Sequence, residues 1–343
     1  MPTIKPQPLR DLAARIFAAT GAAQEDAAWI ADLLVKANLR GHDSHGVIRV
    51  PQYIRDWKDG TLDAKAKPAI ARETATTAIV DGKHGYGQVV ARRGAEVAIA
   101  KAAAHNLSAV GLVNCNHLGR LADYAELIVR QGLIALVYVN ASGNAHSVAP
   151  YGGKGRRIST NPLAYAIPNG AGPPLIFDVA TSVVAEGKLR VKKNRKEAVP
   201  LGWIIDAEGN PTTDTARFYE EPRGALVQFA GHKGYGLGLL VEILGGILTT
   251  SGASAESVGP VRNGALFLAI RVDAFRPLAE FTTEVDALTE RMHSTSPAPG
   301  FKKVLVPGDP EEATERERTA NGIFVEDETW NQIQAVAKEL KAA

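Results

Sequence analysis

The sequence predicts an α/β protein with a helical N-terminal region. Helical periodicity dominates residues 8–58, where apolar residues recur at three- and four-residue steps on both sides of a polar turn at 41–46. Further along the chain, short apolar runs typical of strands alternate with helical segments. We find no internal repeat and no low-complexity tract, and no linker separates the halves clearly.

The elements follow one another at short intervals. A strand over 77–80 leads through a glycine-rich turn at 81–87 into an alanine-rich helix over 88–105. A strand over 109–113, a helix over 121–130 and a strand over 133–139 come next. Strand-like pieces with turns then fill 158–205.

The longest apolar stretch runs from 231 to 248 and contains six glycines. It lacks an uninterrupted apolar span of about 20 residues, so it is not a membrane anchor. We expect a buried helix whose small residues let other backbones come close. A strand over 265–272 follows, and the tail over 276–343 is charged and mostly helical.

Composition is that of an ordinary globular enzyme, with 45% hydrophobic and 22% charged residues among 343. The net charge of +2 gives no electrostatic footprint for nucleic acid or a membrane surface as partners. The start of the chain shows no secretory signal, and Cys115 is its one cysteine. These observations predict a cytoplasmic protein.

The segment GHDSHG at 41–46 concentrates His42, Asp43, Ser44 and His45 in one turn. Asp43 or Ser44 is a good N-cap for the following helix, on which His45 and Arg49 would share a face. A proton carrier beside a fixed cation suits an enzyme acting on a carboxylate. The alternatives are a helix–helix corner with solvated histidines, or a metal site at His42 and His45, for which spacing suggests no third ligand.

Other polar residues stand at the ends of strand-like segments. His117 follows one strand and Gly119–Arg120 opens the next helix, where free backbone N–H groups favour an anion. Asp178 is a lone carboxylate in an apolar run, either an edge-strand residue facing water or a buried partner for a cation or imidazole. Taken singly, each residue is explained by loop polarity, but together they favour a composite active site. The set also includes Ser142, Thr160, Asn161, His232 and Lys233.

Standard motifs are absent from the sequence. It contains no G-x-G-x-x-G, so a conventional Rossmann fingerprint is missing, and no Walker A loop, G-x-S-x-G elbow, H-E-x-x-H or Cys–Cys zinc spacing. No metal is therefore expected.

Six motifs in the same order resemble the type-2 malate/L-lactate dehydrogenase family of NAD(P)-dependent oxidoreductases. They are GHDSHGVIR at 41–49, NCNHLGR at 114–120, STNP at 159–162, FDVATS at 177–182, GHKGYGL at 231–237 and VPGDP at 306–310. The resemblance covers residues 8–335, and the hydroxycarboxylate dehydrogenase branch, which reduces aryl-pyruvates such as hydroxyphenylpyruvate, looks nearest.

The resemblance implies an unusual, non-Rossmann dinucleotide-binding α/β domain. We expect a cofactor-binding domain over 116–230, and a substrate and dimerisation domain built from 1–115 and 231–343. The protein would be a homodimer that transfers a hydride between NAD (or NADP) and C2 of a small 2-hydroxy or 2-oxo acid of the malate, lactate or aryl-pyruvate type.

The resemblance also implies roles for single residues. His45 would donate and accept the proton, with Ser44 and Asp178 as relay partners, although one branch uses the residue at His117 instead. Arg49 would clamp the substrate carboxylate, and Thr160 would add a hydrogen bond. The implied cofactor contacts, which also include His45, are Gly119, Arg120, Leu121, Ser142, Leu175, Ile176, Phe177, Asp178, Val179, His232, Lys233, Asn263, Val306, Pro307, Gly308 and Asp309.

One departure from the family pattern concerns cofactor choice. Many members have an arginine where this chain has Leu305, and a 2′-phosphate prefers a bidentate arginine, so NAD is expected over NADP. The basic run at 188–196 could replace that cation, or could be a solvated hairpin. Reduction of a cyclic imine carboxylate and a catalytically silent dinucleotide-binding protein are the alternative functions.

Overall fold

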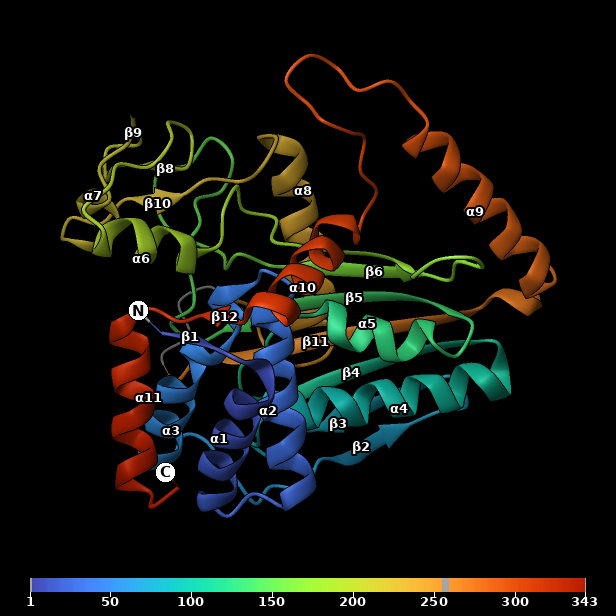
Figure 1. Cartoon of the computed structure of the whole chain (residues 1–343), viewed down its shortest axis with the longest axis horizontal. Coiled ribbons are helices and arrows are strands. Elements are labelled where there is room, and N and C mark those ends of the chain that lie inside the picture. Colours follow the sequence, from blue (N-terminus) through green and yellow to red (C-terminus); the bar gives the residue numbers. More distant parts are fainter. Residues whose placement is uncertain (1, 255–258, 343) are drawn as a thin grey trace.

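The computed structural model describes residues 2–254 and 259–342 and has a seven-stranded mixed sheet at its centre (Figure 1). The strand order is β2-β3-β4-β11-β5-β6-β7, and every neighbouring pair is antiparallel except β3 and β4. The strands are β2 (Ala69–Glu73), β3 (Thr77–Asp81), β4 (Leu107–Cys115), β5 (Leu133–Ser142), β6 (Leu163–Ile167), β7 (Leu175–Val179) and β11 (Arg262–Arg271). This sheet confirms the predicted α/β class, and its antiparallel strands distinguish it from a doubly wound fold.

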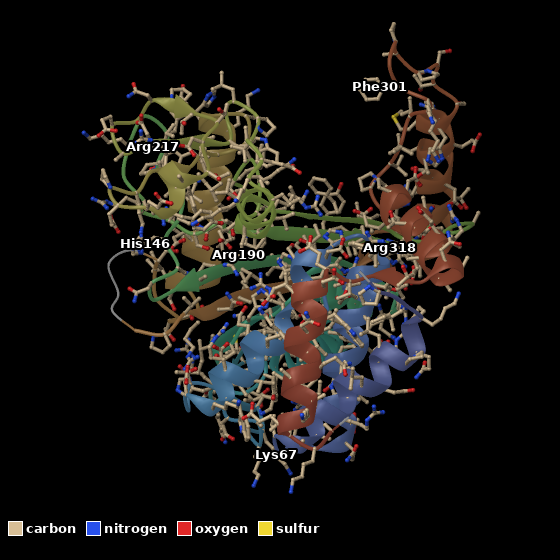
Figure 2. All side chains as sticks on the ribbon, turned by 60° about the vertical axis from the view of Figure 1, so that its left-hand side comes forward. Lys67, His146, Arg190, Arg217, Phe301 and Arg318 are labelled. Atoms are coloured by element: carbon tan, nitrogen blue, oxygen red, sulfur yellow. The ribbon has the colours of Figure 1, made fainter. Side chains whose placement is uncertain are left out.

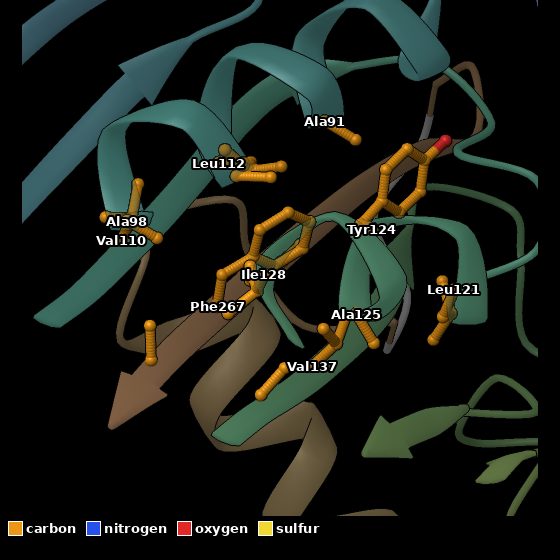
Figure 3. Packing of buried hydrophobic residues seen from close by; sticks show 14 of the residues in the cluster. Ala91, Ala98, Val110, Leu112, Leu121, Tyr124, Ala125, Ile128, Val137 and Phe267 are labelled. Atoms are coloured by element: carbon orange, nitrogen blue, oxygen red, sulfur yellow. The ribbon is translucent and has the colours of Figure 1, made fainter. Parts of the chain in front are cut away.

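Two helices cover one face of this sheet, α4 (Gly87–His105) and α5 (Ala122–Val129). The alternation of each strand points small and β-branched residues such as Val137 and Ala164 into this layer. Tyr124 of α5 stacks on Phe267 of β11 with ring centroids 5.9 Å apart, and Figure 3 shows both rings between the helices and the strands.

A second buried cluster joins the N-terminal and C-terminal helices. It is formed by α1 (Pro6–Ala19), α2 (Gln24–Leu39), α3 (Val50–Lys58) and α11 (Asp327–Glu339), beside the short pair β1 (Thr3–Ile4) and β12 (Ile323–Phe324). Figure 1 shows α11 alongside α3. The helical N-terminal region predicted from periodicity is therefore confirmed.

Residues 144–228 contain a smaller unit with its own core. It holds α6 (Glu186–Asn194), α7 (Ala216–Tyr219) and the three-stranded sheet of β8 (Ile204–Ile205), β9 (Pro211–Thr212) and β10 (Ala225–Leu226). The large sheet crosses the domain boundary expected at residue 115, because β4 ends there while β5, β6 and β7 come from the segment 116–230. Figure 2 shows this unit, marked by Arg217, projecting on the same side as the arm marked by Phe301.

The glycine-rich stretch forms α8 (His232–Val241), which continues as a π-helical turn at Glu242–Ile247. Its glycines allow the helix to pack close to strand β5, since a Cβ on Gly246 would lie 2.3 Å from the Asn140 side chain. The expectation of a buried helix is wrong for the single chain, because one side of the helix exposes a stripe of large apolar residues. These are Leu237, Leu239, Leu240, Ile243, Ile247 and Leu248.

The tail is mostly helical, as expected, and contains α9 (Leu278–His293) and α10 (Asp309–Asn321). No residue of α9 is buried, and Figure 1 shows it projecting from the body with the segment 294–308 returning to α10.

Candidate active site

A cleft of about 470 Å³ lies between the 43–49 segment, the loop after β4 and the first residues of α6. It brings together eight of the residues expected at the active site. These are Ser44, His45, Arg49, His117, Gly119, Leu121, Thr160 and Asn263.

The 41–49 segment does not form the capped helix that was expected. Two 3-10 turns, Asp43–His45 and Val47–Arg49, precede α3, and neither Asp43 nor Ser44 caps that helix. The cause is Asn38, whose side-chain oxygen accepts the Val47 amide at 2.8 Å. A Cβ on Gly46 would lie 2.2 Å from that oxygen, so glycine is required where the two turns meet. The Asp43 carboxylate instead accepts from the Asn38 amide.

The two histidines of the cleft lie parallel, with ring centroids 5.6 Å apart. Ser44 Oγ lies 3.0 Å from His45 Nδ1, and Tyr53 Oη lies 2.7 Å from His117 Nδ1. Desolvation, followed by the positive charge of Arg49, lowers the pKa of His45 to about 3. The same two causes lower the pKa of His117 well below its ordinary value. Both imidazoles are therefore neutral at ordinary pH.

Arg49 is oriented by its own segment. Its Nε donates to the Ser44 carbonyl at 2.7 Å, and Nη1 donates to Gln52 Oε1 at 2.6 Å. These bonds fix the plane of the guanidinium at the wall of the cleft and leave Nη2 without a bond among the described residues. A fixed, desolvated arginine of this kind binds a carboxylate.

Asp178 lies in a second cavity with His42, Arg120 and Gly308. Its Oδ2 accepts the Ala122 amide at 2.9 Å, so the anion at the start of α5 is a carboxylate of the chain itself. Burial raises the pKa of Asp178. The structure thus places it on the edge strand β7, with Ala122 rather than His45 as its hydrogen-bonding partner.

Arg120 is held by a buried ion pair in the same region, with Nη2 2.6 Å from Asp123 Oδ1. Although burial opposes it, the charges of Arg120 and Lys36 lower the pKa of Asp123. His42 lines the second cavity, and its Nε2 is 3.5 Å from Glu311 Oε1. Among the described residues, no group of three or more His, Cys, Asp or Glu side chains is placed to hold a metal ion.

A third cavity, of about 510 Å³, is lined by Leu175 and by the segment Val306, Pro307, Gly308 and Asp309. It shares Pro173, Pro174 and Gly308 with the second cavity, whose lining includes Ile176. Gly119 and Leu121 line the cleft while Arg120 and Ala122 line the second cavity. The second and third cavities therefore adjoin each other, and the segment 119–122 lies between the second cavity and the cleft. We refer to the three cavities together as the track.

Five expected cofactor contacts lie apart from this track. Ser142 ends β5, where its hydroxyl donates to the Arg262 carbonyl. Phe177 is exposed on β7 with its ring against Tyr165, and Val179 pairs with Leu163. His232 and Lys233 are exposed at the start of α8, with the His232 ring against Tyr151.

Several residues of the site were not found from the sequence. Asn38 and Tyr53 occupy ordinary helical positions, and Gln88 lies inside an alanine-rich helix. Arg262 lines the cleft from the first position of β11 and donates to Asn116 Oδ1. The sequence offers one signal for the helical residues of this set. Each places an amide or a hydroxyl at a position that helical periodicity assigns to the core, where it needs a hydrogen-bonding partner.

Within the part of the chain that the structure describes, no helix is long and apolar enough to cross a bilayer.

The model of the malate/L-lactate dehydrogenase family matches residues 4–334 of this chain. Hydroxycarboxylate dehydrogenase B of Escherichia coli strain K12 is 34% identical over 97% of the chain and 93% of its own length. L-sulfolactate dehydrogenase of Methanocaldococcus jannaschii is 35% identical over 98% of the chain and 97% of its own length. A solved structure described as a putative malate/lactate dehydrogenase from E. coli superposes with a TM-score of 0.94 at 33% identity, covering 99% of this chain and 96% of that one.

Proposed function

The chain belongs to the malate/L-lactate dehydrogenase family and is an oxidoreductase of hydroxy and oxo acids, and we propose that it reduces a 2-oxo acid at C2 with NADH as hydride donor. The observation that carries this proposal is the convergence of two neutral histidines and one oriented arginine in a single cleft.

Different residues of the cleft have different roles in the proposed carbonyl reduction. Arg49 holds the substrate carboxylate, which places the neighbouring carbonyl against the imidazoles. Thr160, which also lines the cleft, supplies a further hydrogen-bond donor. As the carbonyl oxygen gains negative charge, a protonated imidazole donates a proton to it and becomes neutral, and in the reverse direction the neutral imidazole removes the hydroxyl proton. We assign this proton to His45.

Substrate binding prepares His45 for this role. Arg49 is the largest electrostatic contributor that lowers the pKa of both histidines. A substrate carboxylate on Arg49 offsets that charge and so raises both pKa values towards the range where an imidazole exchanges protons. Catalytic protonation is thereby coupled to the acid group of the substrate.

The track fits a dinucleotide. The bound nicotinamide would supply or accept the hydride at the cleft. Gly119 and Gly308 allow the backbone to approach a ligand, since each has a positive φ and no atom within 3.3 Å of an added Cβ. Asn140 Oδ1, which belongs to a residue lining the cleft, is a buried acceptor with no partner among the described residues and fits an amide donor. Asp178 and Arg120 would line the middle of the track.

The far cavity supports NAD over NADP. Its lining includes the carboxylates of Asp286, Glu290 and Asp309, and neither an arginine nor a lysine is among its described lining residues. A carboxylate accepts hydrogen bonds from ribose hydroxyls and repels a 2′-phosphate.

The basic run at 188–196 lies on and just after α6 and has other contacts. Lys192 pairs with Glu197 at 2.5 Å, Arg195 pairs with Glu326 at 3.1 Å, and Lys193 lies over the Tyr219 ring. Among the side chains of this run that the structure describes, none lines the three cavities of the track.

Steady-state kinetics with purified protein test the proposed reaction. We expect consumption of NADH with one or more 2-oxo acids of the malate, lactate or aryl-pyruvate type, and a lower kcat/KM with NADPH. The absence of an arginine for the 2′-phosphate should favour NADH over NADPH by at least about tenfold in kcat/KM. Turnover confined to cyclic imine carboxylates would replace the proposed substrate, and cofactor binding without turnover on either panel would indicate a silent protein.

We propose further that the protein is a homodimer. The apolar stripe of α8 lies beside a sheet face that carries half-buried large residues. These are Ile134, Leu136, Tyr138, Tyr165, Ile167, Leu268 and Ile270, beside the exposed Phe177. An apolar surface on this scale is typical of an obligate interface. A second copy would also bring a His232 and a Lys233 to a track from which this chain's own are separated.

The cytoplasmic location stays a prediction. Cys115 is free and buried, and its thiol donates to the Asn263 carbonyl, which agrees with a reducing compartment.

A further inference from the structure

A chain of three polar side chains leads from the protein core into the cleft. Gln88 Nε2 of α4 donates to Tyr53 Oη of α3 at 2.8 Å, and Tyr53 Oη lies 2.7 Å from Nδ1 of His117. Gln88 and Tyr53 are each 1% exposed. A buried chain of this kind is stable only if every proton in it has an acceptor.

The hydrogen-bond donors among these three side chains determine where the protons lie. An amide nitrogen only donates, so the bond from Gln88 occupies a lone pair of the Tyr53 oxygen. Burial raises the pKa of Tyr53 above its ordinary range, so the phenol keeps its proton and donates it in a hydrogen bond. The acceptor within reach is His117 Nδ1. The neutral His117 ring therefore carries its proton on Nε2.

We propose that Tyr53 and Gln88 are positioning residues that fix His117 as a neutral Nε2–H donor in the cleft. Because Nδ1 faces Tyr53 in the core, Nε2 is the nitrogen left for a ligand, and His117 then donates a hydrogen bond to the carbonyl oxygen of the substrate. This inference rests on the proposed function and deepens it.

The same reasoning separates the roles of the two histidines. His45 Nδ1 contacts the Ser44 hydroxyl, which can donate or accept, so its tautomer is free to change as a proton passes. His117 is fixed from behind by a group that only donates to it. His45 is the proton carrier, and His117 orients and polarises the carbonyl.

Long-range ¹H–¹⁵N correlation spectra of the full-length protein labelled on histidine nitrogen report the tautomer directly, with His117 assigned from a His117→Gln sample. We expect the Nε2–H pattern for His117 in the wild type and a mixture of tautomers in Tyr53→Phe. In Gln88→Glu the carboxylate accepts from Tyr53, so the phenol oxygen accepts instead from His117 and the pattern shifts to Nδ1–H. An Nδ1–H pattern in the wild type overturns the proposal.

Kinetics provide a second readout. Tyr53→Phe should lower kcat by about tenfold or more, the kinetic equivalent of one lost hydrogen bond, while KM for the 2-oxo acid stays within about threefold. An unchanged kcat together with an unchanged tautomer overturns the proposal. If the wild type turns over no 2-oxo acid, the spectra still decide the tautomer, so this inference and the proposed function fail separately.

Tyr86→Phe is the matched control. Tyr86 is a second buried tyrosine, its ring lies 6.4 Å from that of Tyr53, and its hydroxyl contacts Thr20 Oγ1 at 3.0 Å instead of His117. It should keep the Nε2–H pattern and the kcat of the wild type. If Tyr86→Phe reproduced the effect of Tyr53→Phe, the cause would be a loosened core and the proposal would be wrong.

Discussion

Single residues near His45, the proposed proton carrier, keep its imidazole neutral in the structure. Desolvation and Arg49 lower the pKa of His45, and Ser44 holds its Nδ1. In the absence of substrate the ring is neutral, and its unprotonated nitrogen can accept the hydroxyl proton when a hydroxy acid is oxidised. In the reductive direction the substrate must first offset the charge of Arg49.

Replacing His45 by alanine should reduce kcat by about 10²–10⁴-fold, because the developing alkoxide then has no proton donor. The Kd for NADH, measured by fluorescence titration, should change little. His105→Ala is the control, since His105 is an exposed histidine at the end of α4. If His45→Ala kept nearly full kcat while His117→Ala lost it, the assignment of the two histidines would be reversed.

Arg49 has two roles that two substitutions separate. Arg49→Lys keeps the charge but loses the planar fork, so KM for the 2-oxo acid should rise by about tenfold or more with little change in pH dependence. Arg49→Gln removes the charge as well and so raises the pKa of His45 and His117.

The pH profile of hydroxy acid oxidation checks this distinction. The neutral imidazole is the base, so kcat/KM falls as the pH drops below its pKa. Because the pKa of His45 is about 3 in the wild type, the profile should stay flat down to about pH 5. It should begin to fall at higher pH in Arg49→Gln. If Arg49→Lys and Arg49→Gln gave identical pH profiles, the charge of Arg49 would not be the cause of the lowered pKa of His45.

Residue identities at the site were predictable where the chemistry is local in sequence, as at Ser44, His45 and Arg49. The N-cap expectation failed because the side chain of Asn38, the last residue but one of α2, accepts the Val47 amide and holds the 43–49 segment in two 3-10 turns. Tyr53 and Gln88 were missed for a related reason. A hydrogen bond between two helices leaves no periodic signal in either of them.

At the scale of elements, the position of α6 decides the shape of the cleft. A Cβ on Gly187, in the first turn of α6, would lie 2.8 Å from the Ser44 Cβ, so this helix is in direct contact with the turn Asp43–His45. The expectation of strand-like pieces over 158–205 was wrong at α6, which is a helix over Glu186–Asn194. Its contact with Ser44 was not predictable from periodicity, because it joins the small 144–228 unit to the N-terminal region.

Gly187→Ala should therefore displace Ser44 and with it His45, lowering kcat several-fold while the protein remains folded. A Gly155→Ala substitution is the control, because it lies in the same unit and its added Cβ would have no neighbour closer than 3.7 Å. Thermal unfolding should be similar for the two variants. Equal kcat values for both would show that the turn tolerates the shift and that α6 does not position it.

At the scale of the whole molecule, the surface left exposed by one chain indicates a second copy. The amphipathic patterns of strands and helices predicted the core under α4 and α5, but a stretch that is apolar all round does not reveal whether its own chain or another covers it. This is why 231–248 was expected to be buried and is instead exposed in the single chain. Ile247, at 57% exposed, lies within the apolar stripe.

Ile247→Glu should convert a dimer to a monomer in sedimentation velocity, because a charge buried at an apolar interface costs several kcal/mol. Leu201→Glu is the matched control, since Leu201 is 70% exposed on the small unit, outside the stripe and the sheet face. A monomeric wild type, or a dimeric Ile247→Glu variant with unchanged stability, would contradict the proposed interface.

Mixing two inactive variants tests whether the dimer completes the active site. If each track uses His45 of one chain and His232 of the other, a mixed dimer of His45→Ala and His232→Ala subunits contains one site with both histidines intact. Random exchange of subunits should then restore about a quarter of the wild-type activity, since half of the dimers are mixed and half of their sites are intact. If both residues act within one chain, every site in the mixture carries a substitution. Mixing would then restore nothing, and the separation of His232 from the track would have to be closed by movement of α8 within its own chain.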